Sequence, residues 1–163
     1  MESTKFKTTL GILRIFMGLI FLWAFFDKLL GWGFATTADK AWIAGGSPTY
    51  GFLTFGVHGP FANFFHGLAS SSLVTWLFML GLLFIGTTLT FGIMTKLGTM
   101  AGALLVFFMY LALIPPENHP FIDEHLIYAL VMILLGFADS GKYFGFGNTW
   151  SRTNLVQKYS FLK

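Results

Sequence analysis

The amino-acid sequence predicts an all-α integral membrane protein: a bundle of four transmembrane helices, with short interfacial helices in the first outer loop. The first observation is composition, because the 163 residues are 55% hydrophobic and only 10% charged, whereas a soluble domain is about a quarter charged. The second is the succession of four apolar segments, separated by proline, glycine or charged residues. The third is length, which allows one membrane domain, residues 1–163, and no sizeable soluble module.

The first expected span covers residues 10–30. The preceding segment is polar and basic, but the apolar run is longer than the core of a signal peptide and ends in Phe25-Phe26-Asp27, without a small-residue cleavage site. We therefore expect an uncleaved transmembrane helix. Arg14 lies near its start, and its side chain is expected to extend to the lipid headgroups.

Residues 31–72 form a long connection that contains three turn signals: Gly31-Trp32-Gly33, Gly45-Gly46-Ser47-Pro48 and Gly59-Pro60. A structureless loop of this length is uncommon in a small protein. Phenylalanines alternate there with a few polar residues, among them His58, Asn63 and His66. This pattern favours one or two short helices lying in the membrane interface, and a re-entrant segment is the alternative.

Residues 73–93 and 97–114 are the second and third expected spans. Each supplies about 20 residues, enough to cross roughly 30 Å of hydrocarbon at about 1.5 Å per residue. The third begins with Gly98-Thr99-Met100-Ala101-Gly102, a spacing of small residues that lets a neighbouring helix approach closely. An equally good alternative is that these glycines have no packing role and reflect only the ordinary glycine content of a membrane helix. Pro115 and Pro116 are expected to stop this helix.

The fourth expected span covers residues 124–139. Asp123 is expected to cap its N-terminus, where the acidic side chains of the first turn also suit the helix dipole. The alternative to a catalytic role is that Asp123 only caps the helix. Asp139, Gly141 and Lys142 are expected to end the helix.

Basic residues predict the orientation. The N-terminal segment, the turn at Lys96 and the C-terminal tail hold eight of the ten Lys and Arg residues, which places both termini of a multi-pass plasma-membrane protein in the cytoplasm. All four histidines, Asp27 and Asp123 then lie on the outer side. The net charge of +3 is explained by this orientation rather than by binding of nucleic acid.

The sequence contains no cysteine. This excludes disulfides, thiolate metal sites, iron–sulfur clusters and covalent haem attachment. His58 and His66 are two helical turns apart and would need His119 or His125 to form a metal or bis-imidazole haem site. Because no HxxxH or HExxH spacing is present, we expect no metal and no haem.

Three segments resemble the DoxX/DoxD family of small four-helix membrane proteins: LRIFMGLIFLWAFFDKLLGWG, GTTLTFGIMTKLGTMAG and IDEHLIYALVMILLGFADSGKYFGFG. The resemblance implies a four-helix bundle. It also implies a function like that of the DoxD-type subunit of thiosulfate:quinone oxidoreductase, which passes electrons from reduced sulfur to membrane quinone with a second, DoxA-like subunit. The first loop, rich in phenylalanine and histidine, does not match the family pattern.

A quinone site needs an apolar slot and groups near the carbonyls that donate hydrogen bonds and exchange protons. Histidine is the natural proton-exchanging donor near neutral pH, and a carboxylate can relay the proton. Lys28 can stabilise the charge that develops on reduction. The expected catalytic residues are His125, Glu124 and Asp27, and the expected quinone-binding residues are Lys28, Tyr128, Trp23 and Asp123. The alternatives are that Asp27 and Lys28 mark the membrane interface and that His125 makes a structural hydrogen bond between helices.

The expected function is therefore a membrane redox subunit that binds quinone near the outer leaflet and couples oxidation of thiosulfate, or a similar reduced sulfur species, to quinone reduction. Its expected partners are membrane lipid, quinone, a second redox subunit and a further copy of the chain packed against its glycine faces. The alternative is a non-catalytic membrane scaffold, or a protein that handles lipid or cargo.

Overall fold

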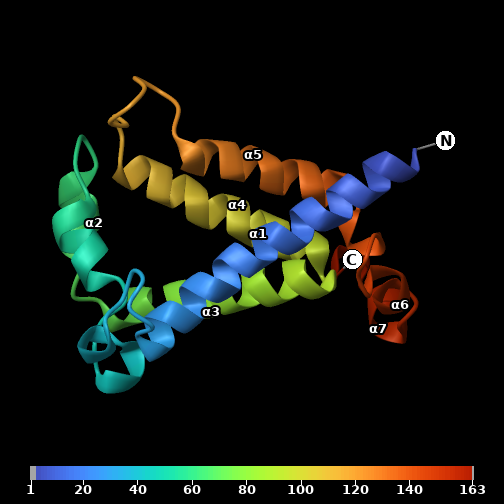
Figure 1. The fold of residues 1–163 in the computed structure, drawn as a ribbon, viewed down its shortest axis with the longest axis horizontal. Helices are drawn as coiled ribbons and strands as arrows, with labels where there is room; N and C mark the ends of the chain where they lie inside the picture. The colour runs from blue at the N-terminus through green and yellow to red at the C-terminus, as the bar shows by residue number, and fades with distance from the viewer. Residues whose placement is uncertain (1–2, 163) are drawn as a thin grey trace.

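The computed structural model describes residues 3–162, which form helices and loops and contain no strand. Four longer helices form the body: α1 (Thr4–Leu30), α3 (Ser72–Phe91), α4 (Thr95–Ala112) and α5 (Glu124–Phe137). They bury one shared apolar cluster, to which α1 gives Met17 and Phe21, α3 gives Ile85, and α5 gives Met132 and Leu135. Helix α1 packs mainly against α3, and α5 packs mainly against α4 (Figure 1).

Three of these helices, α1, α3 and α4, are long and apolar enough to cross a membrane. This confirms an all-helical membrane protein. Helix α5 is apolar but has only 14 residues, and at about 1.5 Å per residue it is about 21 Å long, short of the roughly 30 Å of bilayer hydrocarbon. The described residues thus contain three candidate spans, and the fourth expected one, residues 124–139, is a shorter helix.

Local capping explains where the helices begin and end. Helix α1 starts at Thr4, before the expected residue 10, because the Ser3 hydroxyl accepts a hydrogen bond from the Phe6 N–H at 3.2 Å. It ends where Gly31 adopts the left-handed conformation. Helix α4 ends at Ala112, just before Pro115 and Pro116, as the prolines predict.

The glycines of α4 lie in close helix contacts. A Cβ atom at Gly102 would lie 2.9 Å from the Met132 side chain of α5 and 3.2 Å from that of Ile85 in α3. One at Gly98 would collide with the Thr88 side chain of α3. The small-residue spacing therefore permits close packing, rather than reflecting ordinary glycine content.

Arg14 does not extend to the headgroups, and that expectation was wrong. Its side chain is 0% exposed. Its guanidinium donates hydrogen bonds to the carbonyl oxygens of Leu89 at 2.7 Å, Tyr143 at 3.0 Å and Phe144 at 3.1 Å. The side chain turns inward because it meets three carbonyl acceptors there, and it joins α1 to the end of α3 and to the C-terminal segment.

The first loop folds into short helices, as expected from its aromatic and polar pattern. These are η1 (Ala38–Lys40), η2 (Trp42–Ala44), η3 (Phe52–Gly56) and α2 (Ala62–Leu68). A second apolar cluster, which includes Leu53, Val57 and Phe65, packs this region onto Ala112 at the end of α4.

The C-terminal segment contains η4 (Ser140–Lys142), α6 (Gly147–Ser151), α7 (Asn154–Lys158) and η5 (Ser160–Leu162). The Trp150 indole N–H donates to the Leu162 carbonyl at 2.6 Å and closes this segment on itself. The two ends of the chain and the short α3–α4 turn lie at one end of the body, and the first loop and the α4–α5 loop lie at the other (Figure 1).

Candidate functional site

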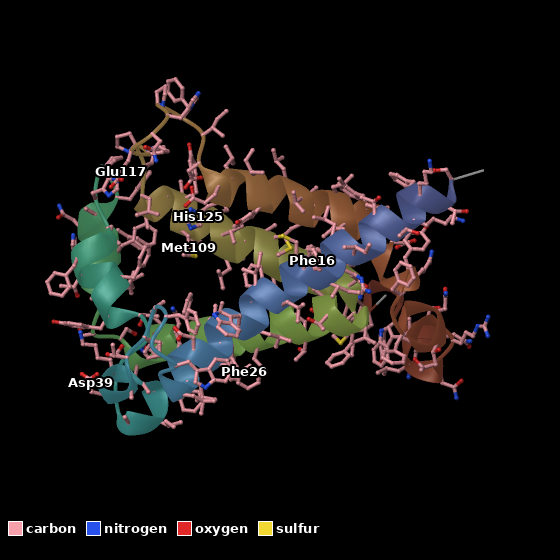
Figure 2. All side chains as sticks on the ribbon, viewed as in Figure 1. Phe16, Phe26, Asp39, Met109, Glu117 and His125 are labelled. Carbon is pink, nitrogen blue, oxygen red and sulfur yellow. The ribbon has the colours of Figure 1, made fainter. Side chains whose placement is uncertain are left out.

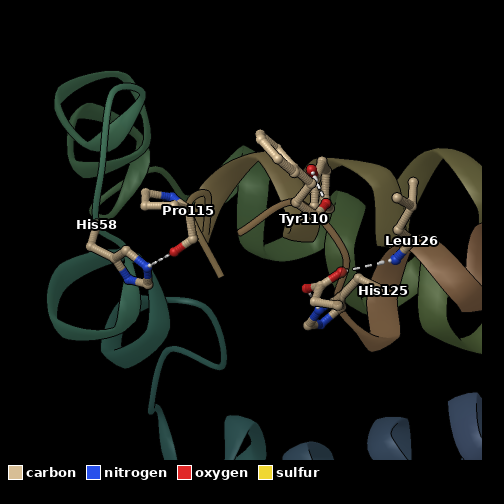
Figure 3. Close-up of polar contacts among 7 residues, drawn as sticks. His58, Tyr110, Pro115, His125 and Leu126 are labelled. Atoms are coloured by element: carbon tan, nitrogen blue, oxygen red, sulfur yellow. Dashed lines mark hydrogen bonds and ion pairs between the residues drawn. The ribbon is translucent and has the colours of Figure 1, made fainter. Parts of the chain in front are cut away.

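The candidate site is at the start of α5, where a carboxylate and an imidazole are joined by a short hydrogen bond. Asp123 is the N-cap, as predicted, and its Oδ1 accepts from the Leu126 N–H at 3.0 Å (Figure 3). Its Oδ2 lies 2.7 Å from His125 Nδ1. The cap therefore does two things at once: it starts the helix and it orients the imidazole.

This geometry assigns the tautomer of a neutral His125. An ionised carboxylate only accepts hydrogen bonds, so the proton must be on Nδ1, and Nε2 keeps its lone pair as a proton acceptor. The exposed fraction of the side chain is 14% for His125 and 9% for Asp123. The pair is thus mostly buried and held in one arrangement, as in sites where a carboxylate positions a catalytic histidine.

Glu124 and Tyr128 are next to this pair. Glu124 is exposed, and its carboxylate lies with the ligating atoms of Asp123 and His125 within 4.8 Å of one another. These three side chains are the ones in residues 3–162 that could jointly hold a metal ion. Tyr128 is half-buried and packs on the main apolar cluster, so it borders the site from the hydrocarbon side.

A pocket of about 260 Å³ opens beside Asp123 and Glu124, and His125, the hydrogen-bond partner of Asp123, does not line it. Its volume is just below the roughly 300–1,000 Å³ of typical small-molecule sites. It can therefore hold one small ring, such as a quinone head, but not that ring together with a long apolar tail. It is lined by His58, Leu113, Pro116, Glu117, Asn118, Ile122, Asp123 and Glu124.

Contacts from distant parts of the chain hold the pocket wall. The His58 Nε2–H donates to the Pro115 carbonyl at 3.1 Å, and the His58 backbone N–H donates to the Ala112 carbonyl at 3.2 Å (Figure 3). The Tyr110 hydroxyl donates to the Phe121 carbonyl at 2.7 Å. Sequence reasoning missed the roles of His58 and Tyr110, and no local signal reveals them, because His58 and Pro115 are 57 residues apart.

His119 has a local role. Its Nδ1 accepts hydrogen bonds from the backbone N–H groups of Phe121 at 3.1 Å and Ile122 at 3.0 Å. It therefore shapes the turn that leads into α5.

Asp27 is not at this site. It is buried at the end of α1, where its Oδ1 accepts from the Phe34 N–H at 3.2 Å and its Oδ2 accepts from the Ala35 N–H at 3.0 Å. Both carboxylate oxygens therefore hold the first turn of the loop. Lys28, the next residue, is half-buried at the same helix end.

Trp23 also belongs to the end of α1. Its ring lies 5.2 Å from that of Trp32 and 4.9 Å from that of Phe34, measured between ring centroids. Figure 2 shows Phe26, at this end of α1, well away from His125. The structure therefore brings together Asp123, Glu124, His125 and Tyr128, and it does not bring Asp27, Lys28 or Trp23 to them.

Charged groups at the opposite end of the molecule form a separate exposed cluster. Asp139 Oδ2 accepts a hydrogen bond from Lys142 Nζ at 2.8 Å, and Lys96 Nζ lies 3.7 Å from Asp139 Oδ1. The hydrogen bond from Lys142 is the main reason that the pKa of the Asp139 carboxyl lies below its ordinary value. This cluster joins the α3–α4 turn to the segment after α5.

Comparisons with known proteins return nothing: no family model, no curated protein and no solved structure matches this chain.

Proposed function

We propose that the chain is a membrane redox subunit that binds the head of a quinone at the start of α5, with His125 as the group that exchanges its proton. The observation that carries this proposal is the 2.7 Å hydrogen bond between Asp123 and His125, which leaves His125 Nε2 as the acceptor. Asp123 positions the imidazole. Glu124, which is exposed, connects it to water.

The location suits a substrate that partitions into lipid. The pair lies at the first turn of an apolar helix, and exposed apolar side chains such as Ile127 and Leu130 follow it along α5. A quinone tail can run along this face, while the ring enters the pocket lined by Asp123 and Glu124, next to the imidazole that Asp123 holds. Proton exchange then takes place at the edge of the apolar region, where water can supply protons.

Electrons and protons balance as follows. Reduction of one quinone to quinol takes up two electrons and two protons, and His125 passes the protons to the quinone oxygens. The electrons come from a reduced sulfur species; when two thiosulfate ions join through a new S–S bond, they release the two electrons required. The sequence has no cysteine, so electrons pass from the donor directly or through a second redox subunit.

Membership in the DoxX/DoxD family is part of the proposal, and it rests on the three sequence segments that resemble that family. The proposed topology has both termini in the cytoplasm of a plasma membrane. It is supported by Lys5, Lys96, Lys142 and Lys158, which belong to the end of the body that carries both chain ends. A cysteine at Asn118 should then react with an impermeant thiol reagent from outside intact cells; labelling only after lysis would reverse the topology.

Quinone binding and reduction by protein in lipid nanodiscs test the function. We expect saturable binding of a short-chain quinone, and a reduction rate about 10²-fold lower in His125→Gln, in line with loss of a general acid–base group. Asp123→Asn keeps an N-cap acceptor but removes the charge that orients the imidazole, and should lower the rate about 10–100-fold while the fold is retained.

His66→Gln is the matched control, because His66 is exposed and its side chain has no hydrogen bond among the described residues. Its rate should equal that of the wild type. If the wild-type protein binds no quinone, or if His125→Gln reduces it at the wild-type rate, the redox proposal fails and a non-catalytic membrane role becomes the better explanation.

A further inference from the structure

A second and larger pocket, of about 420 Å³, lies between the first loop and the start of α3. It shares no lining residue with the pocket at the start of α5. The first loop, which supplies part of its wall, lies at one end of the body (Figure 1). Two aromatic side chains from different segments meet there: Trp42 and Trp76, with ring centroids 4.5 Å apart and ring planes at 72°. The lining residues are Trp42, Gly45, Gly46, Ser47, Tyr50, Ala69, Ser70, Ser71, Ser72, Thr75 and Trp76.

Hydrogen bonds hold the wall of this pocket in place. The hydroxyls of Thr49 and Thr75 are 2.7 Å apart, and those of Ser47 and Thr75 are 3.2 Å apart. Both threonines are buried. The loop is thereby fastened to the first turn of α3, so the pocket is built by the fold itself.

Other polar groups in the lining have no protein partner. Within residues 3–162, the side-chain hydroxyls of Tyr50, Ser70 and Ser72 make no hydrogen bond. Tyr50 is 48% exposed and Trp76 is 54% exposed, so each offers surface to a ligand. The pocket thus combines open aromatic rings with several free hydroxyls, and none of its lining residues is Asp, Glu, Lys, Arg or His.

This lining chemistry selects among ligands. A phosphate or other anion would lack a cationic partner, and a metal cation would lack a carboxylate. A quaternary ammonium group would be attracted by the tryptophan and tyrosine rings but would leave the hydroxyls of the lining unused. A quinone offers only two carbonyl acceptors and would find no Asp, Glu, Lys, Arg or His side chain to exchange its protons. A sugar ring suits both the aromatic rings and the hydroxyl groups of the lining. Its C–H face packs on an aromatic ring, and its many hydroxyls exchange hydrogen bonds with serine and tyrosine hydroxyls.

We infer that the pocket formed by Trp42, Trp76, Tyr50 and the Ser70–Ser72 segment binds an uncharged hexose ring. This inference does not depend on the quinone proposal. The ring can come from a glycolipid headgroup, because the pocket is at the start of a candidate span, or from a free sugar in solution.

Two binding measurements distinguish these sources. In the first, glucose is titrated into protein held in phosphatidylcholine nanodiscs and followed by saturation-transfer NMR. In the second, native mass spectrometry counts monoglucosyl diacylglycerol retained by protein from mixed nanodiscs, with phosphatidylglycerol as the anionic competitor. Saturable binding of free glucose identifies a soluble sugar, and selective retention of the glycolipid without glucose binding identifies a lipid headgroup.

In either case Trp76→Ala should weaken binding at least tenfold. Trp23→Ala is the matched control, because Trp23 is 48% exposed at the neighbouring helix end and does not line the pocket; it should bind as the wild type does. Should Trp76→Ala fail to fold, Ser72→Leu gives the same test, since it places an apolar side chain at an exposed lining position.

Three results would overturn the inference: no saturable binding of either sugar probe, equal binding by the wild type and the pocket variants, or preferential retention of phosphatidylglycerol over the glycolipid.

Discussion

Replacement of Arg14 by methionine removes a buried cation that joins three parts of the fold. In the native structure its guanidinium hydrogen-bonds the carbonyls of Leu89, Tyr143 and Phe144, and no carboxylate in residues 3–162 forms an ion pair with it. Methionine fills a similar volume but donates no hydrogen bond. The substitution therefore leaves three carbonyl oxygens without their partner.

The size of the effect follows from those three acceptors. A buried acceptor left unsatisfied costs about 1–3 kcal/mol, so the upper limit is about 9 kcal/mol. Part of this is offset because the charged guanidinium no longer has to be desolvated, and because water can reach the carbonyls at the edge of the bundle. We expect a net loss of about 3–5 kcal/mol, which at about 2–4 °C per kcal/mol lowers the midpoint of thermal unfolding by about 10 °C.

Thermal unfolding in detergent micelles, followed by intrinsic tryptophan fluorescence, measures this shift. Arg14→Lys should fall between the wild type and Arg14→Met, because an ammonium keeps the charge but lacks the planar fork that reaches several acceptors. Arg152→Met is the control, since Arg152 is exposed and its side chain has no hydrogen bond among the described residues. A midpoint for Arg14→Met equal to that of Arg152→Met would refute the reasoning and favour a side chain extended to the headgroups.

Three further predictions use the same unfolding assay. Asp27→Asn should lower stability by about 2–4 kcal/mol, because its amide can accept only one of the two backbone N–H groups that the carboxylate holds, and it presents a donor to the other; an unchanged midpoint would contradict this role. Gly92→Ala should cost at least about 1–3 kcal/mol, because Gly92 has a φ of 71° and an added Cβ would collide with the Arg14 guanidinium; wild-type stability would contradict that contact. The lowered pKa of Asp139 means that its stabilising contribution is fully present above the ordinary carboxyl pKa of 3.8 and is lost as the pH falls through the lower folded-state pKa. The wild type should therefore lose its small advantage over Asp139→Asn between pH 5 and about pH 2, and an advantage that is constant with pH would argue against the hydrogen bond from Lys142.

Local sequence signals predicted local structure well. The apolar segments correspond to α1, α3, α4 and α5, and Asp123 caps α5 as its position before an apolar run predicts. The reason is that capping and helix periodicity depend on residues within one or two turns. The fourth apolar segment forms a helix as predicted, and with 14 residues α5 is shorter than the three candidate spans.

The candidate site was predictable only in part. Asp123, Glu124, His125 and Tyr128 are neighbours in sequence, and a helix start keeps them together. The expected addition of Asp27 and Lys28 required α1 and α5 to converge at this end. They do not, because α1 packs mainly on α3 and α5 packs mainly on α4, and the two helix ends diverge (Figure 1).

By itself, the sequence determined that this protein is helical, apolar enough for a membrane, free of cysteine chemistry and rich in titratable groups before its last long helix. Only the tertiary structure decided which polar groups meet. Arg14 and Leu89 are 75 residues apart, and Arg14 and Tyr143 are 129 apart; no periodic pattern encodes such pairs. A buried polar group needs hydrogen-bond partners, and for that reason Arg14, which hydropathy assigned to the membrane surface, is buried between α1, the end of α3 and the C-terminal segment.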